Sequence, residues 1–574
     1  MTTVTQINEH CFSVVKGHWT HEHLMTAESV GLTVANSSTL TGDVRKVWPD
    51  ALHKFLWHCC TDLFAQKNKS YKEAVMMMFR NMYKSYRGYL KDSFFPRINY
   101  ARPLYKHQEN ALVNMLPHQF NFLSFDMGMG KTITSATLSK ILNVRRTIII
   151  APAGVKWNWY HDMTDDWGYD PLYWTILDRQ RSKCIFGFAE RFVVVNYEMI
   201  SKPWVWHHLT KSEVGHIIID EVHLAKNHKT KRYKNVEKLV QFFPKARVTM
   251  LSGTPITNRI NDMFAYFKLA QHPLGKNESF FKRRYLDRSN GDRGKIVGAK
   301  NIEELTVRNS NFMIRKKAEE CLDLPKLIIN KYYLEDTEIT DEYKEVLAEM
   351  YKTKMALSEA GNAKTVGQLE MQMDSNVHSL NRILATAKAK RIAELVEKIH
   401  SEGRKVIVFS TYKAALSALE SIFVDNCVKI DGSVDSHKRS VLIEKFKKDP
   451  DCFLFLGNMK AAGVGINLVN ASDVIFMNFP FTPDDLEQPQ KRAHRIGQKR
   501  PVNAYYTIVK NSIDEHIYNL IVDKSEDINY VLDKGKKGVV HYGQVMSKLF
   551  KTLINQYAED NNMKKIVESE FEEV

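Results

Sequence analysis

A glycine-rich stretch, FLSFDMGMGKT at residues 122–132, has the residue types of a loop that holds phosphate groups. Such a loop needs backbone N–H groups close to the phosphate oxygens, a lysine for the β and γ phosphates and a hydroxyl for Mg²⁺. These requirements are met, in order, by Gly128, Gly130, Lys131 and Thr132. The general pattern also opens with a glycine, and Phe125 stands at that position. The stretch therefore predicts a nucleotide site with one departure from the pattern.

The residues on either side of this stretch favour a true phosphate site over a chance match. FNFLSF before the loop is strand-like, and TITSATLSKIL after it is helical in pattern. The N-terminus of a helix attracts anions, because its free N–H groups and its dipole both favour negative charge. Strand, glycine turn and helix are therefore all in place to bind a phosphate.

An Asp-Glu pair follows the apolar run in HIIIDEVH. Asp220 is placed there for a magnesium-bound water, and Glu221 is placed to polarise the attacking water. The alternative is an ordinary surface pair, since Asp-Glu dipeptides are common. Downstream of a phosphate loop, the catalytic interpretation is favoured. The later LSGTP at residues 251–255 is either a simple turn or a link between the nucleotide site and a moving element.

A basic segment near the end of the chain, QPQKRAHRIGQKR, contains Arg492 and Arg495 three positions apart. A helix would place both arginines on one face. Two guanidinium groups there could reach a γ-phosphate and stabilise its charge in the transition state. The alternative is a basic helix face that contacts solvent or DNA.

Short β-branched runs alternate with helical stretches in two parts of the chain. The runs are TIIIAP, RFVVVNY, HIIID and RVTMLSG in the first part and KVIVFS, CVKIDGS, CFLFLG, DVIFMN and NAYYTIV in the second. Buried strands separated by helices indicate parallel sheets covered on both faces. We therefore expect an α/β fold with two parallel-sheet lobes and a helical insertion between them. The expected regions are a mostly helical N-terminal accessory region (1–95), lobe 1 (96–270), the insertion and linker (271–390), lobe 2 (391–525) and a helical tail (526–574).

The bulk composition limits the class of protein. Hydrophobic residues make up 44% and charged residues 26% of the 574 residues, a balance typical of a globular chain with sizeable cores. The net charge of +16 favours a polyanionic partner, usually nucleic acid, although a generically basic protein is an equal alternative on charge alone. The seven scattered cysteines favour a reducing compartment. We expect an intracellular protein without a membrane anchor, cytoplasmic if the source is bacterial or viral, as we favour, and nuclear if it is eukaryotic.

An ordered series of motifs resembles the Swi/Snf-related ATPases, which are DNA translocases of helicase superfamily two. The series is YKHQENAL, DMGMGKT, TIIIAPAGVKWNW, VVVNYEMI, IIIDEVHLAKN, LSGTP, KVIVFST, DGSVDSHKR, KAAGVGINL and QKRAHRIGQ. The resemblance covers about residues 100–525. It implies two RecA-like lobes, ATP and Mg²⁺ as cofactors and DNA, duplex or forked, as the partner.

The resemblance also implies roles for single residues. The family's phosphate loop has no glycine at the position of Phe125 either, which accounts for that departure. ATP would be bound by Gln108, which reads the adenine edge, by Asp126, Met127, Gly128, Met129, Gly130, Lys131 and Thr132, and by Gln488. Thr132 and Asp220 would hold the metal, Glu221 would act on the water, and Arg492 and Arg495 would be arginine fingers. Pro489 and Lys491 depart from the family's last motif.

Loop residues after the predicted strands are candidates for contacts with the nucleic-acid backbone. They are Lys156, Trp157, Asn196, Tyr197, Ser410, Thr411, Ser433 and Lys460. Each could instead be an ordinary loop residue, and Asn458 and Met459 replace the family's usual Ser-Thr before Lys460.

The favoured function is ATP-driven translocation on double-stranded DNA. The alternative is strand annealing or fork remodelling, because APAGVKWNW and DEVHLAKN resemble the HARP-like annealing helicases. An RNA helicase and a catalytically silent DNA-binding scaffold are less favoured, the scaffold because Lys131, Glu221, Arg492 and Arg495 are all present.

Overall fold

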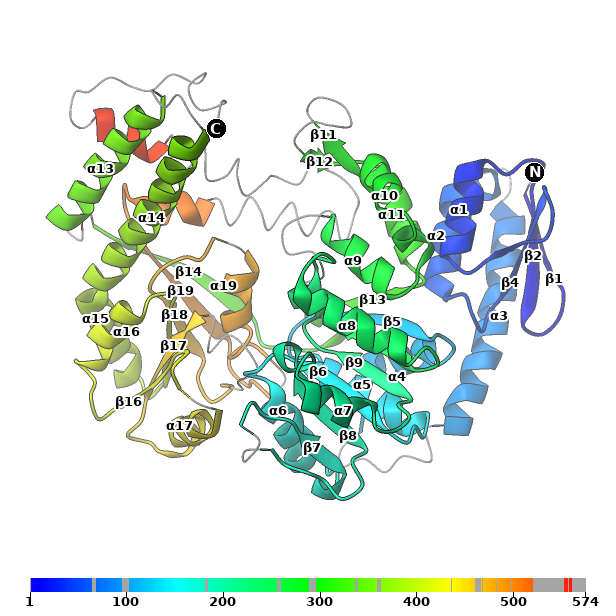
Figure 1. Ribbon diagram of the computed structural model, residues 1–574, viewed down its shortest axis with the longest axis horizontal. Coiled ribbons are helices and arrows are strands. Elements are labelled where there is room, and N and C mark those ends of the chain that lie inside the picture. Colours follow the sequence, from blue (N-terminus) through cyan, green and yellow to red (C-terminus); the bar gives the residue numbers. More distant parts are fainter. Residues whose placement is uncertain are drawn as a thin grey trace. The chain divides into compact units, whose positions relative to one another are not determined.

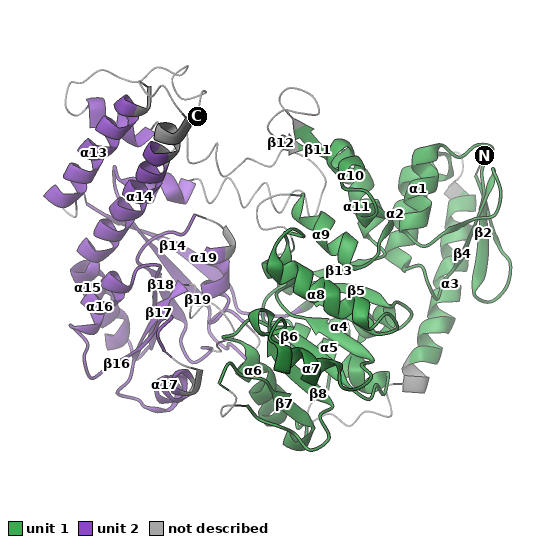
Figure 2. Ribbon diagram, viewed as in Figure 1, with its two compact units in different colours: residues 1–321, 529–539 green, residues 322–528, 540–574 purple. Residues whose placement is uncertain are grey.

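The computed structural model describes most of the chain and divides it into two units (Figure 1, Figure 2). The residues described are 2–64, 69–94, 103–180, 184–253, 255, 260–288, 296–335, 339–358, 363–434, 436–459, 466, 468–481, 483–495, 497–519, 552–555 and 557–559. The first unit runs from the N-terminus to Cys321, and the second begins at Leu322. Among the described residues, no helix is both long and apolar enough to cross a membrane.

The first unit contains a seven-stranded parallel sheet. Its order is β13 (Met313–Lys316), β5 (Phe120–Phe125), β10 (Arg247–Leu251), β9 (His216–Ile219), β6 (Thr147–Ala151), β8 (Phe192–Asn196) and β7 (Trp174–Ile176). The β-branched strands β6, β8 and β9 are buried at every residue, as in sheets that helices cover on both faces. The main helices are α4 (Lys106–Met115), α5 (Lys131–Ile141), α6 (Lys156–His161), α7 (Pro203–Thr210), α8 (Lys231–Phe242) and α9 (Asp262–Leu269). The strands predicted for this part are confirmed.

The N-terminal accessory region adds a four-stranded antiparallel sheet that the sequence analysis did not predict. Its order is β1 (Thr3–Gln6), β2 (Cys11–Val15), β4 (Thr39–Asp43) and β3 (Thr33–Val34), accompanied by α1 (His21–Ser29), α2 (Pro49–Cys59) and α3 (Lys69–Phe94). Buried and more exposed residues alternate along β2 and β4, but only over a few residues. The buried ones include Phe12, Val14 and Leu40. Gly42 lies under the ring of Phe12, where a Cβ atom would collide with it.

Polar contacts, one of them buried, fix the accessory region to the rest of the first unit. Arg308 of α11 (Ile302–Asn309) is 2% exposed, and its Nε donates to Ser29 Oγ at 2.9 Å. Arg284 of α10 (Glu278–Tyr285) bridges Glu22 at 2.7 Å and Glu304 at 2.5 Å. The accessory region is therefore part of this unit and not a separate tethered module.

The second unit contains a six-stranded parallel sheet. Its order is β14 (Leu327–Leu334), β19 (Val502–Val509), β18 (Asp473–Phe476), β15 (Val406–Ser410), β17 (Leu454–Asn458) and β16 (Cys427–Ile430). The longer helices are α13 (Asp341–Ser358), α14 (Ala363–Ala387), α15 (Ala389–Ser401), α16 (Lys413–Glu420), α17 (Ser436–Lys448) and α19 (Pro483–Gln490). A fully buried ion pair, Lys388 with Asp514 at 2.8 Å, ties the junction of α14 and α15 to the segment after β19. All five strands predicted here are confirmed.

The segment predicted as a helical insertion contributes strands to both sheets. β13 pairs in parallel with β5, and β14 pairs in parallel with β19 along eight residues. A two-stranded antiparallel hairpin, β11 (Leu286–Arg288) with β12 (Ile296–Ala299), also lies in this segment. Both added strands are edge strands and therefore carry mixed polar and apolar residues, which hides them from a search for buried apolar runs. The boundary between the two units, at residues 321 and 322, falls inside the same segment.

Candidate nucleotide site and nucleic-acid loops

The predicted phosphate loop is a tight turn between β5 and α5. Gly128 and Gly130 have φ values of 79° and 84°, in the left-handed region that favours glycine. A Cβ atom on Gly130 would collide with the side-chain amide of Gln108. Lys131 begins α5, so the backbone N–H groups of the first helical turn face the loop. The strand, turn and helix predicted from the sequence are confirmed.

Two side chains from α4 support the loop from beneath. The Nε2 atoms of His107 and Gln108 each lie 3.0 Å from the carbonyl oxygen of Met129. Gln108 is 1% exposed, and its Oε1 accepts from Tyr105 N at 3.0 Å. The role of Gln108 at an adenine edge stays a prediction, since its amide is engaged by the loop. His107 was missed by the sequence analysis, although it directly precedes Gln108 in YKHQ.

The contacts at the start of the loop show the role of Phe125, which stands where the general pattern has a glycine. Phe125 is fully buried, and its ring packs edge-on against the ring of His107 at 5.2 Å. The ammonium of Lys131 donates to the carbonyl oxygens of Phe125 at 2.9 Å and Asp126 at 3.2 Å. Asp126 accepts at Oδ2 from Ala318 N at 3.1 Å, which ties the loop to the segment after β13. The apolar residue thus belongs to the floor of the loop, not to the phosphate cradle.

Asp220 lies at the end of β9 and is 7% exposed. Its Oδ2 accepts from Trp159 Nε1 at 2.8 Å, and its Oδ1 accepts from Glu221 N at 3.0 Å. Burial, with the adjacent Glu221 carboxylate, raises the pKa of the Asp220 carboxyl to about 7, while Lys131 acts to lower it. A buried carboxylate of this kind is stabilised by a bound cation. Together with the hydroxyl of Thr132, it offers the oxygen ligands that Mg²⁺ takes, so the donor set fits that ion.

Glu221 adopts a backbone conformation that is rare outside glycine. Its φ of 49° lies in the left-handed region, where a non-glycine residue typically costs about 1–3 kcal/mol and often marks a functional site. Its Oε2 lies 3.2 Å from His223 Nδ1, which also lies 3.2 Å from Ser252 Oγ. Ser252 belongs to the LSGTP turn. His223 therefore links the Asp-Glu segment to that turn.

Two of the nucleic-acid contacts predicted in the first unit are turned inward. The side chain of Lys156 is 4% exposed, and its ammonium donates to Leu177 O at 2.8 Å and to Asp178 Oδ2 at 2.9 Å. Tyr197 is 1% exposed, and its hydroxyl donates to the carbonyl oxygen of Asp220 at 2.6 Å. Both side chains therefore hold their loops in place from inside, at the edge of the sheet.

The neighbours of these two residues lie nearer the surface. Trp157 is partly exposed, and Asn196, which is 9% exposed, donates to Glu198 Oε2 at 3.2 Å. The loops after β6 and β8 thus remain candidate contacts through residues other than Lys156 and Tyr197.

In the second unit, the predicted contacts after β15 belong to a network of neutral groups. Ser410 is fully buried, and its hydroxyl donates to Asn478 Oδ1 at 2.9 Å. The same oxygen accepts from Thr411 N at 3.0 Å, and Asn458 Nδ2 donates to Thr411 O at 2.8 Å. The ends of β15, β17 and β18 are therefore joined at Thr411. The Ser410 side chain thus holds the strand ends together from inside, whereas Thr411 is partly exposed.

The remaining predicted contacts have separate surroundings. Ser433 is exposed, and both its amide and its hydroxyl donate to Asp431 Oδ1, at 2.7 and 2.5 Å. Lys460 lies outside the described residues.

The prediction that Arg492 and Arg495 lie on one face of a helix is wrong. Helix α19 ends at Gln490, and both arginines lie in the turn that follows. Pro489 has no N–H to donate within the last helical turn, and Gly497 beyond the arginines has a φ of 101°. Arg492 is 7% exposed, and Arg495 Nη1 lies 3.4 Å from Ile466 O. Gln488 lies on α19 and is partly exposed.

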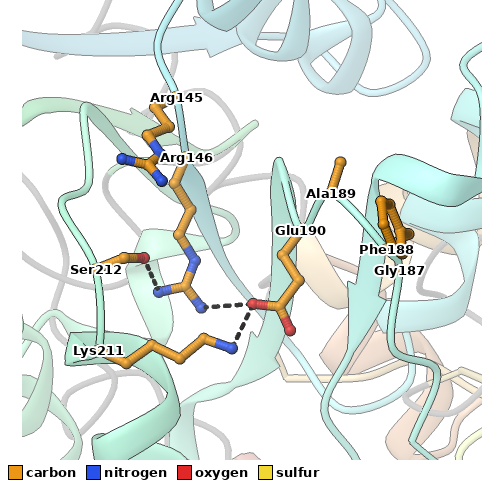
Figure 3. Close-up of a pocket in the computed structure, with 8 residues that line it drawn as sticks. All are labelled: Arg145, Arg146, Gly187, Phe188, Ala189, Glu190, Lys211 and Ser212. Atoms are coloured by element: carbon orange, nitrogen blue, oxygen red, sulfur yellow. Dashed lines mark hydrogen bonds and ion pairs between the residues drawn. The ribbon is translucent and has the colours of Figure 1, made fainter.

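The opposite edge of the first sheet carries a hollow of about 350 Å³ lined by basic groups (Figure 3). Glu190 bridges Arg146 at 3.6 Å and Lys211 at 2.6 Å, and Arg146 Nη1 donates to Ser212 Oγ at 3.1 Å. These residues come shortly before β6, β8 or β9, so they lie near the amino ends of the strands. Glu190 offsets the charge of both cations, and the group braces the loops of that edge.

The similarity to known proteins extends over both units. A model of the SNF2-related domain matches residues 103–391, just over half of the chain, and one of the helicase conserved C-terminal domain matches residues 387–497. A SWI/SNF-related matrix-associated actin-dependent regulator of chromatin subfamily A-like protein 1 homolog of Caenorhabditis elegans is 28% identical over 75% of this chain and 62% of its own length. The DNA annealing helicase and endonuclease ZRANB3 of Homo sapiens is 24% identical over 72% of this chain and 39% of its own.

The chain spans less than two thirds of the length of either relative. The SWI2/SNF2 ATPase core of Sulfolobus solfataricus, solved in complex with double-stranded DNA, aligns with 76% of this chain and 94% of its own. Its identity of 22% and TM-score of 0.35 are too low to add to the assignment. The match of the domain model to just over half of the chain settles the family: this chain belongs to the SNF2-related family, with a helicase C-terminal domain after the SNF2-related domain.

Proposed function

We propose that the chain is an ATP-driven translocase on double-stranded DNA, with Mg²⁺ as the metal that accompanies ATP. Its family makes it an ATP-dependent enzyme of the helicase type. The observation that carries the proposal is the meeting of the phosphate loop and the Asp-Glu segment at one sheet edge. β5 and β9 are separated only by β10, and the Lys131 ammonium acts on the Asp220 carboxyl.

Each group at this edge has a role that follows from its chemistry. Lys131 would hold the β and γ phosphates, and Thr132 and Asp220 would hold Mg²⁺, which would neutralise phosphate charge. Glu221 would accept a proton from the attacking water. Arg492 and Arg495 would stabilise charge on the transferred phosphoryl group, as arginine fingers do. The bound nucleotide would thereby set the conformation of the loops that track the nucleic acid.

The partly exposed loop groups support a backbone contact. Trp157, Thr411 and Ser433 follow strands of the two sheets, and the chain carries a net charge of +16. Contacts with phosphates do not depend on base sequence and weaken with salt. We therefore propose DNA, bound through its backbone, as the partner.

A second candidate function is strand annealing or fork remodelling. It is favoured by the relative named a DNA annealing helicase and endonuclease, and by the accessory region that is fixed to the first unit through Arg308 and Ser29. Such a fixed region would move with the motor and could contact DNA beside it. RNA unwinding and a silent scaffold have no comparable observation in their favour.

The experiment that tests the proposal measures ATP hydrolysis by the full chain with no nucleic acid, duplex DNA, forked DNA, single-stranded DNA and duplex RNA. We expect duplex DNA to stimulate hydrolysis, and the logarithm of its affinity to fall linearly with the logarithm of salt concentration. Stronger stimulation by forked DNA, with annealing of complementary strands, would favour the second function. A chain that no DNA stimulates, or whose DNA affinity ignores salt, would contradict the translocase.

A further inference from the structure

The two loops that follow β6 and β8 each send an aromatic donor back to Asp220. From the first loop, Trp159 on α6 donates its indole N–H to Asp220 Oδ2 at 2.8 Å. From the second, Tyr197 donates its hydroxyl to the Asp220 carbonyl oxygen at 2.6 Å. Both aromatic side chains are 1% exposed. One residue at the nucleotide edge is thus held by both loops, through its carboxylate and through its backbone.

The helix that carries Trp159 is short and is anchored at its start. α6 has six residues, and the Lys156 ammonium ties its first turn to Leu177 and Asp178. Trp157 is partly exposed, whereas Trp159 is buried. Because α6 is so short, a displacement of Trp157 at its surface would also move the buried indole of Trp159.

The second loop has the same layout. The buried Tyr197 directly follows Asn196, the last residue of β8, and the exposed Glu198 comes next. The Tyr197 hydroxyl donates to the carbonyl oxygen of Asp220. Glu221, the residue after Asp220, has the left-handed backbone conformation. A change at this loop would act on the backbone that presents Asp220 and Glu221, whereas a change at the first loop would act on the carboxylate.

We propose that Trp159 and Tyr197 are positioning residues that transmit the state of the two nucleic-acid loops to Asp220. This inference rests on the proposed function, since it assumes that the loops contact DNA and that Asp220 holds Mg²⁺. Hydrogen-bond partners of a metal ligand orient it and tune its affinity for the metal. A DNA contact that shifts α6 would therefore change how well Asp220 holds Mg²⁺. By linkage, bound Mg·ATP would change the affinity for DNA by the same factor.

The first test removes the indole donor by Trp159→Phe in the full chain. One readout needs no turnover: the Mg²⁺ concentration that half-saturates binding of a fluorescent ATP analogue. We expect it to rise about tenfold, the lower end of the range for loss of such a partner. The second readout, stimulation of hydrolysis by duplex DNA, should fall in parallel. Trp174→Phe is the matched control, because Trp174 is also fully buried but its indole nitrogen has no hydrogen-bond partner among the described residues.

The second test removes only the hydroxyl by Tyr197→Phe. DNA stimulation should fall about fivefold, the effect of one lost hydrogen bond, while the Mg²⁺ requirement without DNA changes less than in Trp159→Phe. Tyr83→Phe is the control, since it removes a similar buried hydroxyl that donates to a carbonyl, Val47 O at 2.8 Å, in the accessory region. If Trp159→Phe does not fold, as circular dichroism would show, the Tyr197 pair decides.

The outcomes separate this inference from the proposed function. A wild-type chain that DNA does not stimulate would overturn both the translocase and the transmission from the loops. With a stimulated wild type, Trp159→Phe and Tyr197→Phe chains that match their controls in Mg²⁺ requirement and DNA stimulation would overturn the transmission alone. A raised Mg²⁺ requirement with reduced DNA stimulation would support it.

Discussion

The carboxyl edges of the two sheets are built from different kinds of groups. At the edge of the first sheet, charged groups are held by neighbours: Lys131 by loop carbonyls and Asp220 by an indole and a backbone amide. At the edge of the second, neutral amides and hydroxyls of Ser410, Thr411 and Asn478 bond one another. The first edge therefore has the charges that phosphate chemistry requires, whereas the groups that join the ends of β15, β17 and β18 at the second edge are neutral. Substitutions should accordingly affect turnover at the first edge and nucleic-acid affinity at the second.

The largest expected effect comes from a residue that breaks this division. Arg495 belongs to the second unit, but its proposed role is in hydrolysis. Loss of an arginine finger costs about three to five orders of magnitude in turnover in related enzymes. We expect Arg495→Ala to lose most DNA-stimulated hydrolysis while it keeps ATP binding and DNA binding. Arg495→Lys should restore little, because an ammonium group lacks the planar fork of donors.

The competing interpretation of Arg495 is a basic group that only touches DNA. In that case the alanine variant would lose DNA affinity, lysine would substitute well, and hydrolysis would recover at saturating DNA. Rates of hydrolysis measured against DNA concentration for both variants distinguish the two. Full recovery at high DNA would remove Arg495 from the catalytic residues.

The next largest effect is expected at the first edge. Glu221→Gln keeps the size of the side chain but removes the base, so turnover should fall by about two to four orders of magnitude while ATP still binds. Lys131→Ala should instead weaken nucleotide binding, because the phosphates lose their cation. Glu213→Gln makes the same charge change at an exposed glutamate after α7 and should leave both quantities unchanged. Wild-type turnover in Glu221→Gln would exclude Glu221 as the base.

The sequence was sufficient to predict the parts of the fold that depend on local pattern. Buried β-branched runs such as TIIIA and FVVVN have few alternatives to a strand of a parallel sheet, and all were confirmed. The glycines of the phosphate loop were predictable for the same reason, since a positive φ restricts the choice of residue. The edge strands β13 and β14 were missed, because one open side relaxes the demand for apolar residues.

The site contacts that were missed are all long-range. Nothing local to Trp159 or His107 indicates that the first bonds Asp220 and the second supports Met129, because those bonds depend on strand order. The arginine pair shows the opposite error: a helical spacing was assumed to continue through Pro489, and the chain turns there instead. Lys156 and Tyr197 were candidates for nucleic-acid contacts because they follow strands, but their side chains hold the loops in place from inside.

The smallest expected effect lies in the network of neutral groups that joins the strand ends of the second sheet. Asn478 is fully buried, and its Oδ1 accepts from both the Ser410 hydroxyl and the Thr411 amide. Asn478→Ala would leave these donors without their acceptor, at a cost of about 1–3 kcal/mol for each buried group that stays unsatisfied. We expect a lower Tm and a duplex affinity that falls severalfold, because Thr411 is no longer held. Asn458→Ala, which removes the bond to Thr411 O, should act in the same direction but more weakly. In both variants, turnover at saturating DNA should stay within about twofold of wild type, since both side chains bond the Thr411 segment at the second edge. If Asn478→Ala instead lost turnover as Glu221→Gln does, with DNA saturating and the fold intact, the second edge would have a part in the chemistry and the division between the two edges would fail.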